Sequence, residues 1–226
     1  MSSLKLFIHP LSQPARAVML FCRANSIPHE EVLVDLVKGA QHNEEYAKTV
    51  NPLKKVPVIN HDGFFLKESV AILRYLARTF PVPDNWFPKD SISQAKVDEY
   101  LEWQHLNVRT FGTLYFAEKY IVPRTTKQPP NEKRAANFLK NYITVLNQVE
   151  TIWLKDRPFV AGQDVSIADL LAASEMEQTV LGGYDVKEHH PKIKDYLERV
   201  RSGLQPHYDD VHSTLNKLAL KMKATK

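Results

Sequence analysis

The sequence predicts an α/β N-terminal domain followed by an all-α C-terminal domain. Two observations predict it: strand-like and helix-like apolar patterns alternate over residues 1–80, and helical periodicity dominates beyond a proline-rich stretch. The chain has 226 residues and is 43% apolar, which suits one large domain or two small ones with a buried core. We therefore expect domains at 1–80 and 93–226, joined by a linker at 81–92.

The first half of the N-terminal domain has the pattern of a β-α-β unit. Apolar residues alternate over 4–8, as in a strand, and then recur at helical spacing from Ala15 to Cys22. Pro14 suits the first helical turn, where a missing N–H costs nothing. A second short strand is expected at 32–34, which predicts a parallel pair with a right-handed crossover.

The second half of this domain is predicted to be a hairpin and a helix. Strands at 56–59 and 64–66 flank the tight-turn signal His61-Asp62-Gly63. A helix is expected from Ser69 to Phe80. Three prolines between 81 and 88 cannot continue that helix, so they mark the linker.

The C-terminal domain is predicted to contain only helices. Long helices are expected over 93–120 and 138–153, with a proline-bearing loop at 123–131 between them. Shorter helices are expected at 193–200 and at the basic end, 215–222.

Another helix is predicted to begin just after Ser166. Ser166 can cap its N-terminus, and Asp169 occupies the third helical position, where a capping box needs an acceptor. The loss of such a cap costs about 0.5–2 kcal/mol, so this motif supports folding and not chemistry.

Charge and composition argue against nucleic-acid and membrane partners. The net charge of +4 is small and lies partly in the C-terminal tail, and there is no zinc-finger spacing or RNP-type motif. No run of about 18 apolar residues exists, and the N-terminus lacks the features of a signal peptide. The single cysteine, Cys22, excludes an intrachain disulfide, which is typical of a reducing compartment. We therefore expect a cytoplasmic protein.

Several polar residues of the N-terminal domain are candidates for chemistry, and each has an ordinary structural alternative. Ser12 precedes a helix and could simply start it, while His42 and Lys55 could be solvated. Glu68 and Ser69 open a helix and could cap it. None of these positions is specific when taken alone.

The order of these segments resembles that of a glutathione transferase, and more closely the theta class. The matching segments are Leu11-Ser12-Gln13-Pro14, residues 34–42, Asn51-Pro52-Leu53-Lys54-Lys55-Val56-Pro57, Glu68-Ser69-Val70-Ala71-Ile72-Leu73, residues 98–105 and Ser166-Ile167-Ala168-Asp169-Leu170. The resemblance covers nearly the whole chain. It implies a thioredoxin-like first domain that binds glutathione, a helical second domain that binds the electrophile, and a homodimer.

The resemblance also implies roles in binding glutathione, the co-substrate. Glutathione carries two carboxylates and one ammonium, so its site needs one anion and several donors or cations. We expect Lys55 and His42 at the glycine carboxylate and Glu68 at the γ-glutamyl ammonium. Ser69, through its hydroxyl and its amide at a helix N-terminus, would hold the γ-glutamyl carboxylate.

The Val56–Pro57 bond is expected to be cis because the family has a cis bond there. Val56 would then present its N–H and C=O to the cysteinyl backbone of glutathione. Such a contact adds an extended peptide to a strand.

Ser12 and Arg109 are the residues expected to act on the reacting sulfur. A serine hydroxyl is a good donor, and a donor aimed at sulfur favours thiolate over thiol. The positive end of the helix beginning near Pro14 would add to this, and lowering the thiol pKa by ~2 units needs about 2.7 kcal/mol. Arg109 matches an arginine of some theta enzymes and would stabilise developing negative charge. The alternative for Arg109 is an interhelical or surface arginine.

The predicted activity is transfer of the Ser12-stabilised glutathione thiolate to small electrophiles, namely alkyl halides, epoxides and hydroperoxides. A non-catalytic binding or scaffold module with the same fold is the alternative. A pure scaffold has no physical need for an intact set of Ser12, Lys55, Glu68 and Ser69. A thiol oxidoreductase would need a reactive cysteine at the helix start, whereas Cys22 is expected to be buried and inert.

No metal is expected, because His189 and His190 are adjacent and are predicted to lie in a solvated loop. Two departures from the theta pattern stand out. Lys67 precedes Glu68 and adds a positive charge near the site. The chain ends at Lys226, short of the mammalian theta enzymes, in which C-terminal segments cover the cleft.

Overall fold

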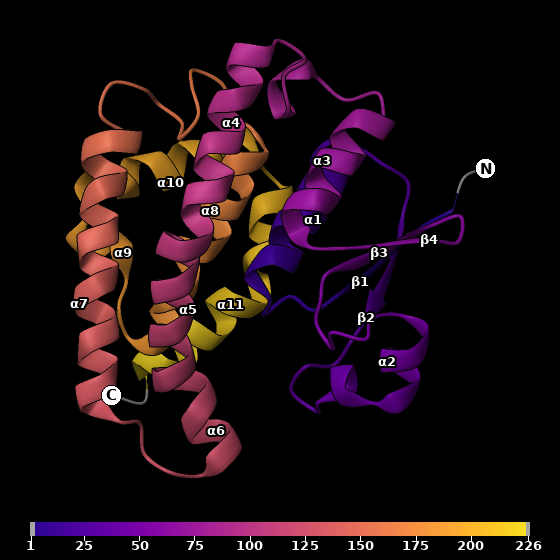
Figure 1. Cartoon of the computed structure of the whole chain (residues 1–226). Coiled ribbons are helices and arrows are strands. Elements are labelled where there is room, and N and C mark those ends of the chain that lie inside the picture. Colours follow the sequence, from indigo (N-terminus) through magenta and orange to yellow (C-terminus); the bar gives the residue numbers. More distant parts are fainter. Residues whose placement is uncertain (1–2, 225–226) are drawn as a thin grey trace.

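A computed structural model describes residues 3–224 and confirms the predicted fold class (Figure 1). A four-stranded mixed sheet with flanking helices forms the thioredoxin-like N-terminal domain. Within the described chain, no strand follows Lys67, and the C-terminal domain is all-helical. The exact limits 1–80, 81–92 and 93–226 stay a prediction.

The N-terminal domain contains the predicted β-α-β unit and hairpin. Its elements are β1 (Leu4–Ile8), α1 (Gln13–Ala24), β2 (Glu30–Leu33), α2 (Glu44–Thr49), β3 (Val58–His61), β4 (Phe64–Lys67) and α3 (Ser69–Thr79). The strand order is β2-β1-β3-β4, with β1 parallel to β2 and antiparallel to β3, and β3 antiparallel to β4. β3 begins later than predicted because Pro57 has no N–H for a ladder hydrogen bond.

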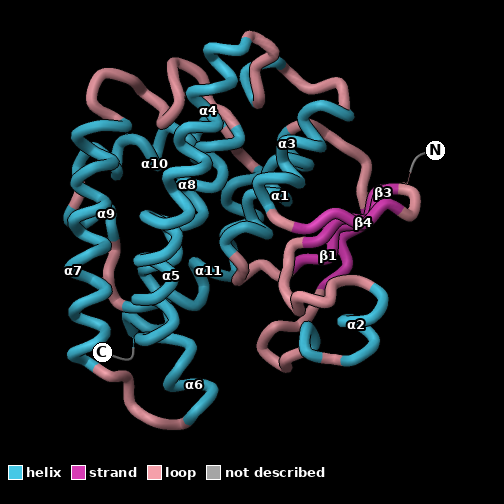
Figure 2. The backbone as a smooth tube through the Cα atoms, viewed as in Figure 1, coloured by secondary structure: helices cyan, strands magenta, loops and turns pink. Residues whose placement is uncertain are grey.

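The C-terminal domain is a bundle of helices (Figure 2). Its helices are α4 (Ser91–Gln104), α5 (Thr110–Phe116), α6 (Val122–Thr126), α7 (Glu132–Gln148), α8 (Ile167–Gln178), α9 (Val186–His189), α10 (Pro191–Gly203) and α11 (His207–Ala224). Three π-helical stretches continue α4, α5 and α7, namely η3 (His105–Arg109), η4 (Ala117–Ile121) and η5 (Val149–Trp153).

The loop predicted at 123–131 is wrong over its first part, because α6 carries the helix through Pro123 to Thr126. Pro123 lies in the first turn of α6, directly after the π-helical η4. Because η4 and α6 follow one another without a break, Pro123 lies inside a continuous helix, where it cannot donate a ladder hydrogen bond. Wider π turns and prolines are both recognised sites of irregularity in a helix, and here they are adjacent. The helix ends instead at Lys127, which has a φ of 60°.

Helix α1 joins the two domains, because it packs against α3 on one side and against α8 and α11 on the other. Figure 1 shows it between the sheet and the helical bundle. One continuous apolar cluster includes Leu6 of β1, Phe21 of α1 and Leu170 of α8. The domains therefore share a core. The linker is docked on it, since buried Trp86 lies edge-on to Phe21 at 5.5 Å between ring centroids.

A fully buried arginine lies in this α1–α8 contact. The guanidinium of Arg16 donates to the carbonyl of Pro10 at 3.0 Å, to the carbonyl of Ser174 at 2.8 Å and to Gln178 Oε1 at 2.8 Å. Burial lowers the pKa of Arg16 to about 10, so the group stays charged at neutral pH. Arg16 thus ties α1 to α8 through polar contacts inside the shared core.

The capping box predicted at α8 is present. Ser166 Oγ accepts from the backbone N–H of Ala168 at 3.3 Å, and Asp169 Oδ2 accepts from the N–H of Ser166 at 2.8 Å. The other oxygen of Asp169 accepts from the N–H of Val160 and the hydroxyl of Tyr196, both at 3.0 Å. The motif therefore also joins α8 to the preceding loop and to α10.

Candidate functional site

A pocket between the two domains brings together six of the eight predicted site residues. The N-terminal domain contributes Lys55, Val56, Pro57, Glu68 and Ser69, and the helical domain contributes Arg109. The other residues that line it are Pro14, Asn51, Lys67 and His105. Residues that lie far apart in the chain therefore form one site.

One wall of this pocket is the loop before β3, where the Val56–Pro57 bond is cis, as the resemblance implies. The carbonyl of Lys55 accepts from the Tyr46 hydroxyl and from Asn51 Nδ2, both at 2.8 Å. Asn51 is buried, so these contacts hold the backbone next to Val56 in place. Val56 lies outside the strand ladders, which leaves its N–H and C=O for another extended backbone.

A second wall is the start of α3. Glu68 has a φ of 67° and makes no side-chain cap hydrogen bond, so its carboxylate does not cap the helix. A positive φ is uncommon for a non-glycine residue, and such conformations cluster at ligand sites. Ser69 follows as the first helical residue and is buried, which places its backbone amide in the open first turn of α3.

Ser12 is the N-cap residue of α1, and its hydroxyl makes no cap hydrogen bond. The residue is 8% exposed, and its N–H donates to the carbonyl of His9 at 2.9 Å. The ordinary capping role is therefore not what this hydroxyl performs. Ser12 itself does not line the pocket, although Pro14, two residues later, does.

His42 is not brought to the pocket. It is exposed and ends the short 3₁₀ helix η1 (Ala40–His42) that precedes α2. Lys55, its predicted partner at the glycine carboxylate, lines the pocket, whereas His42 does not.

Arg109 reaches the pocket from the last residue of η3. His105, at the start of the same π-helical stretch, also lines the pocket. Such stretches widen the helix by one residue per turn and occur often at functional sites. Arg109 Nη1 is hydrogen-bonded and ion-paired to Glu175 Oε1 on α8. Arg109 is thus an interhelical arginine that also lines the pocket, and its role at the reacting sulfur stays a prediction.

The charges of the pocket suit an anionic ligand. Lys55, Lys67 and Arg109 supply three positive charges, and Glu68 supplies one negative charge. Glu175 balances the charge of Arg109 from behind. The remaining groups match a molecule with more than one carboxylate and one ammonium.

Asn51 and His105 line the pocket but were not predicted as site residues, although both lie in segments that resemble the theta class, 51–57 and 98–105. The four-residue spacing of His105 and Arg109 could have indicated that both side chains lie on the same face of one helix. For Asn51 the signal was weaker. Its side chain acts through the carbonyl of Lys55, a contact that no pattern displays.

The structure bears on three other sequence expectations. Cys22 is fully buried, as predicted, and burial raises the pKa of its thiol, which disfavours the reactive thiolate. No group of three metal-ligating side chains is found within residues 3–224. No helix of the described chain combines the length and apolar content needed to cross a bilayer.

The expectation of a solvated loop is wrong for His190, which is 4% exposed. Its Nε2 lies 2.9 Å from the Tyr184 hydroxyl, and its Nδ1 lies 3.4 Å from Glu150 Oε2. Because both ring nitrogens have polar partners, the ring is buried at little cost. His189 is exposed, as expected, but it is the last residue of the short helix α9 and not part of a loop.

Comparison with known proteins identifies both domains. Residues 2–78 match the glutathione S-transferase N-terminal domain family, and residues 115–203 match the C-terminal domain family. Human glutathione S-transferase theta-1 is 38% identical over 220 residues, which is 97% of this chain and 90% of the relative. Mouse theta-2 is 41% identical over 214 residues, or 94% of this chain and 86% of the relative.

Solved structures agree. The apo form of human glutathione S-transferase T1-1 superposes with a TM-score of 0.90 at 37% identity, covering 96% of this chain and 90% of that one. Human theta-2, solved with glutathione and an unknown ligand, superposes with a TM-score of 0.89 at 35% identity, covering 99% and 91%. The chain therefore belongs to the glutathione S-transferase family, in its theta class.

Proposed function

We propose that this protein is a glutathione transferase in which Ser12 stabilises the glutathione thiolate for attack on small electrophiles. The observation that carries the proposal is the interdomain pocket, where Lys55, Val56, Glu68 and Ser69 converge with Arg109. Their charges and open backbone groups complement those of glutathione. The similar human theta-2 structure was solved with glutathione, which supports the same ligand here.

In the proposed complex each part of glutathione has a matching group. Lys55 binds the glycine carboxylate as a cation, and Val56 pairs with the cysteinyl backbone through its N–H and C=O. Glu68 accepts from the γ-glutamyl ammonium. Ser69 binds the γ-glutamyl carboxylate through its hydroxyl and its amide at the α3 N-terminus. His42 contributes only if the segment before α2 moves toward the ligand.

Ser12 and Arg109 act on the sulfur in this proposal. The Ser12 hydroxyl donates to the thiolate, and the N-terminus of α1 adds a positive potential. The thiolate attacks an alkyl halide carbon, so that a sulfur–carbon bond forms while the halide leaves with the bonding electron pair. Arg109 stabilises the negative charge that moves toward the leaving group. Epoxides and hydroperoxides are further substrates of the proposed class.

The Ser12 hydroxyl makes no cap hydrogen bond, and this favours the proposed activity over a non-catalytic scaffold. A scaffold has no use for an N-cap serine that does not cap, two residues before Pro14 in the wall of a pocket whose residues match the charges of glutathione. We also propose a cytoplasmic homodimer, with glutathione and small electrophiles as partners and no metal, nucleic acid or membrane.

Thiolate absorbance of bound glutathione tests the proposal without a guess about the second substrate. A free thiol has a pKa of about 8.5, and the wild type is expected to lower it by ~2 units. Ser12→Ala is expected to bind glutathione but to lose most of this shift. Lys55→Ala, the matched control, should weaken binding while keeping the lowered pKa at saturation.

Two outcomes would contradict the proposal. Bound glutathione with an ordinary thiol pKa in both the wild type and Ser12→Ala would favour the binding module. Failure of the wild type to bind glutathione would remove the assigned site altogether.

A further inference from the structure

Arg109 is held by a carboxylate that is buried behind the pocket. Glu175, on α8, is 2% exposed, whereas the side chain of Arg109 is 35% exposed. Glu175 Oε1 accepts from Arg109 Nη1. The other oxygen, Oε2, has no hydrogen-bond partner among residues 3–224. Within the described chain, the carboxylate of Glu175 thus accepts its hydrogen bond from Arg109.

A buried carboxylate is costly unless it is fully paired, and replacing a buried ion pair with apolar groups is often neutral or stabilising. The nearby cation Arg16 does not compensate for this cost by a direct bond, since its guanidinium donates to Pro10, Ser174 and Gln178 instead. Folding alone therefore gives a weak reason for a carboxylate at 175. Its contact with Arg109 gives a functional reason.

We propose that Glu175 is a positioning residue that holds the Arg109 guanidinium at the reacting sulfur; this inference rests on the proposed function. Glu175 occupies one side of the planar fork of N–H groups, which leaves the other donors for the pocket. The π-helical η3 brings Arg109 to the pocket wall, and α8 fixes its orientation from behind. A displacement of about 1 Å in a positioned group costs up to about 100-fold in rate.

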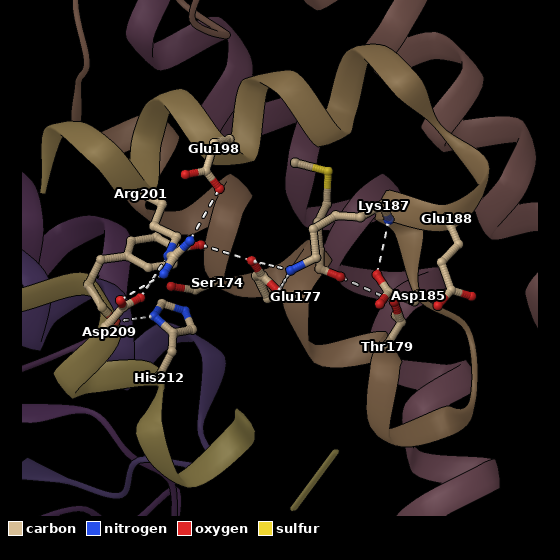
Figure 3. A network of polar contacts seen from close by, with 12 residues as sticks. Ser174, Glu177, Thr179, Asp185, Lys187, Glu188, Glu198, Arg201, Asp209 and His212 are labelled. Atoms are coloured by element: carbon tan, nitrogen blue, oxygen red, sulfur yellow. Dashed lines mark hydrogen bonds and ion pairs between the residues drawn. The ribbon is translucent and has the colours of Figure 1, made fainter. Parts of the chain in front are cut away.

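The same helix supplies a matched control. Glu177 lies two residues after Glu175 and is 9% exposed. It is ion-paired to Lys187 at 3.0 Å and accepts from the Tyr208 hydroxyl at 3.3 Å. These contacts belong to the polar network between α8, α9, α10 and α11 (Figure 3). Glu177, Lys187 and Tyr208 do not line the pocket that contains Arg109. Glu177→Gln therefore removes a buried carboxylate of α8 without touching the proposed machinery.

The experiment compares the kinetics of Glu175→Gln, Glu177→Gln, Arg109→Ala and the double variant Glu175→Gln/Arg109→Ala. Glu175→Gln is expected to lower kcat by roughly ten- to a hundredfold, with the KM for glutathione and the pKa of the bound thiol unchanged. Glu177→Gln should keep the wild-type kcat. In the Arg109→Ala background, Glu175→Gln should cause no further loss, because it acts only through Arg109.

Equal losses from Glu175→Gln in the wild-type and Arg109→Ala backgrounds would overturn the proposal, since they would indicate a structural effect. So would an equal loss of kcat from Glu177→Gln. An unchanged kcat in Arg109→Ala, together with a thiolate shift that depends on Ser12, would overturn this inference and leave the proposed function intact. Absence of glutathione binding in the wild type would overturn both.

Discussion

At the scale of single residues, His212 on α11 is buried with one ring nitrogen bonded. Its Nδ1 donates to the carbonyl of Tyr208 at 2.9 Å, and the two rings stack with centroids 4.2 Å apart. Nε2 has no partner in the part of the chain that the structure describes. Burial lowers the pKa of His212 to about 3, and the cations Arg16 and Lys187 act in the same direction, while Asp209 opposes them.

This depressed pKa predicts a loss of stability in acid that depends on His212. An unfolded histidine has a pKa of about 6.5, so below that pH the unfolded state binds the proton that the folded state excludes. The free energy of unfolding should fall by about 1.4 kcal/mol per pH unit from this residue, or about 2 kcal/mol between pH 7 and pH 5. Urea unfolding of the wild type and His212→Phe should show that slope in the wild type only.

His189→Phe is the control for this prediction, since His189 is exposed and near the same helices. It should keep the wild-type pH dependence. An identical slope in the wild type and His212→Phe would contradict the prediction, because it would show that folding does not change the pKa of His212.

At the scale of elements, α8 depends on the cap at its N-terminus. Ser166 is buried, and its hydroxyl both accepts from the N–H of Ala168 and donates to Asp169 Oδ2 at 3.0 Å. Ser166→Ala removes both bonds and is expected to lower the free energy of unfolding by about 1–2 kcal/mol. Because α8 also carries Glu175, the same variant should weaken the support of Arg109.

Ser202→Ala serves as the comparison, because Ser202 is exposed on α10. It is expected to change the free energy of unfolding by less than about 0.5 kcal/mol. Urea titrations followed by circular dichroism give both values. Equal effects of the two substitutions would remove the capping box as a source of stability.

At the scale of the whole molecule, the shared core and Arg16 couple the two domains. Arg16→Ala leaves a cavity and takes the donors away from the carbonyls of Pro10 and Ser174 and from Gln178. Each buried acceptor left without its donor costs about 1–3 kcal/mol, so a large drop in stability is expected. Arg23→Ala, near the C-terminal end of α1, removes a half-buried salt bridge to Glu31 and should cost less, about 1 kcal/mol.

Coupling also predicts how the molecule unfolds. All three tryptophans lie beyond residue 80, so their fluorescence follows the linker and the helical domain, while circular dichroism follows both domains. In the wild type the two transitions should coincide, as in a single cooperative unit. In Arg16→Ala they should separate. Separate transitions in the wild type would show that the shared core does not couple the domains.

The sequence by itself determined the parts that depend on neighbours in the chain. Apolar alternation at 4–8, the Asp62-Gly63 turn and the Ser166–Asp169 box act over a few residues, and each appears in the structure. Through the order of its segments, the sequence also indicated the family, the fold and most of the pocket residues.

Only the tertiary structure decided which distant groups meet. Glu175 lies 66 residues after Arg109 and carries no local signal for that partner. The burial of His190 depends on Tyr184 and Glu150 in the same way. A sequence pattern reports spacing along one element, whereas the cost of burying a charge or a ring nitrogen is set by partners that folding brings from other elements.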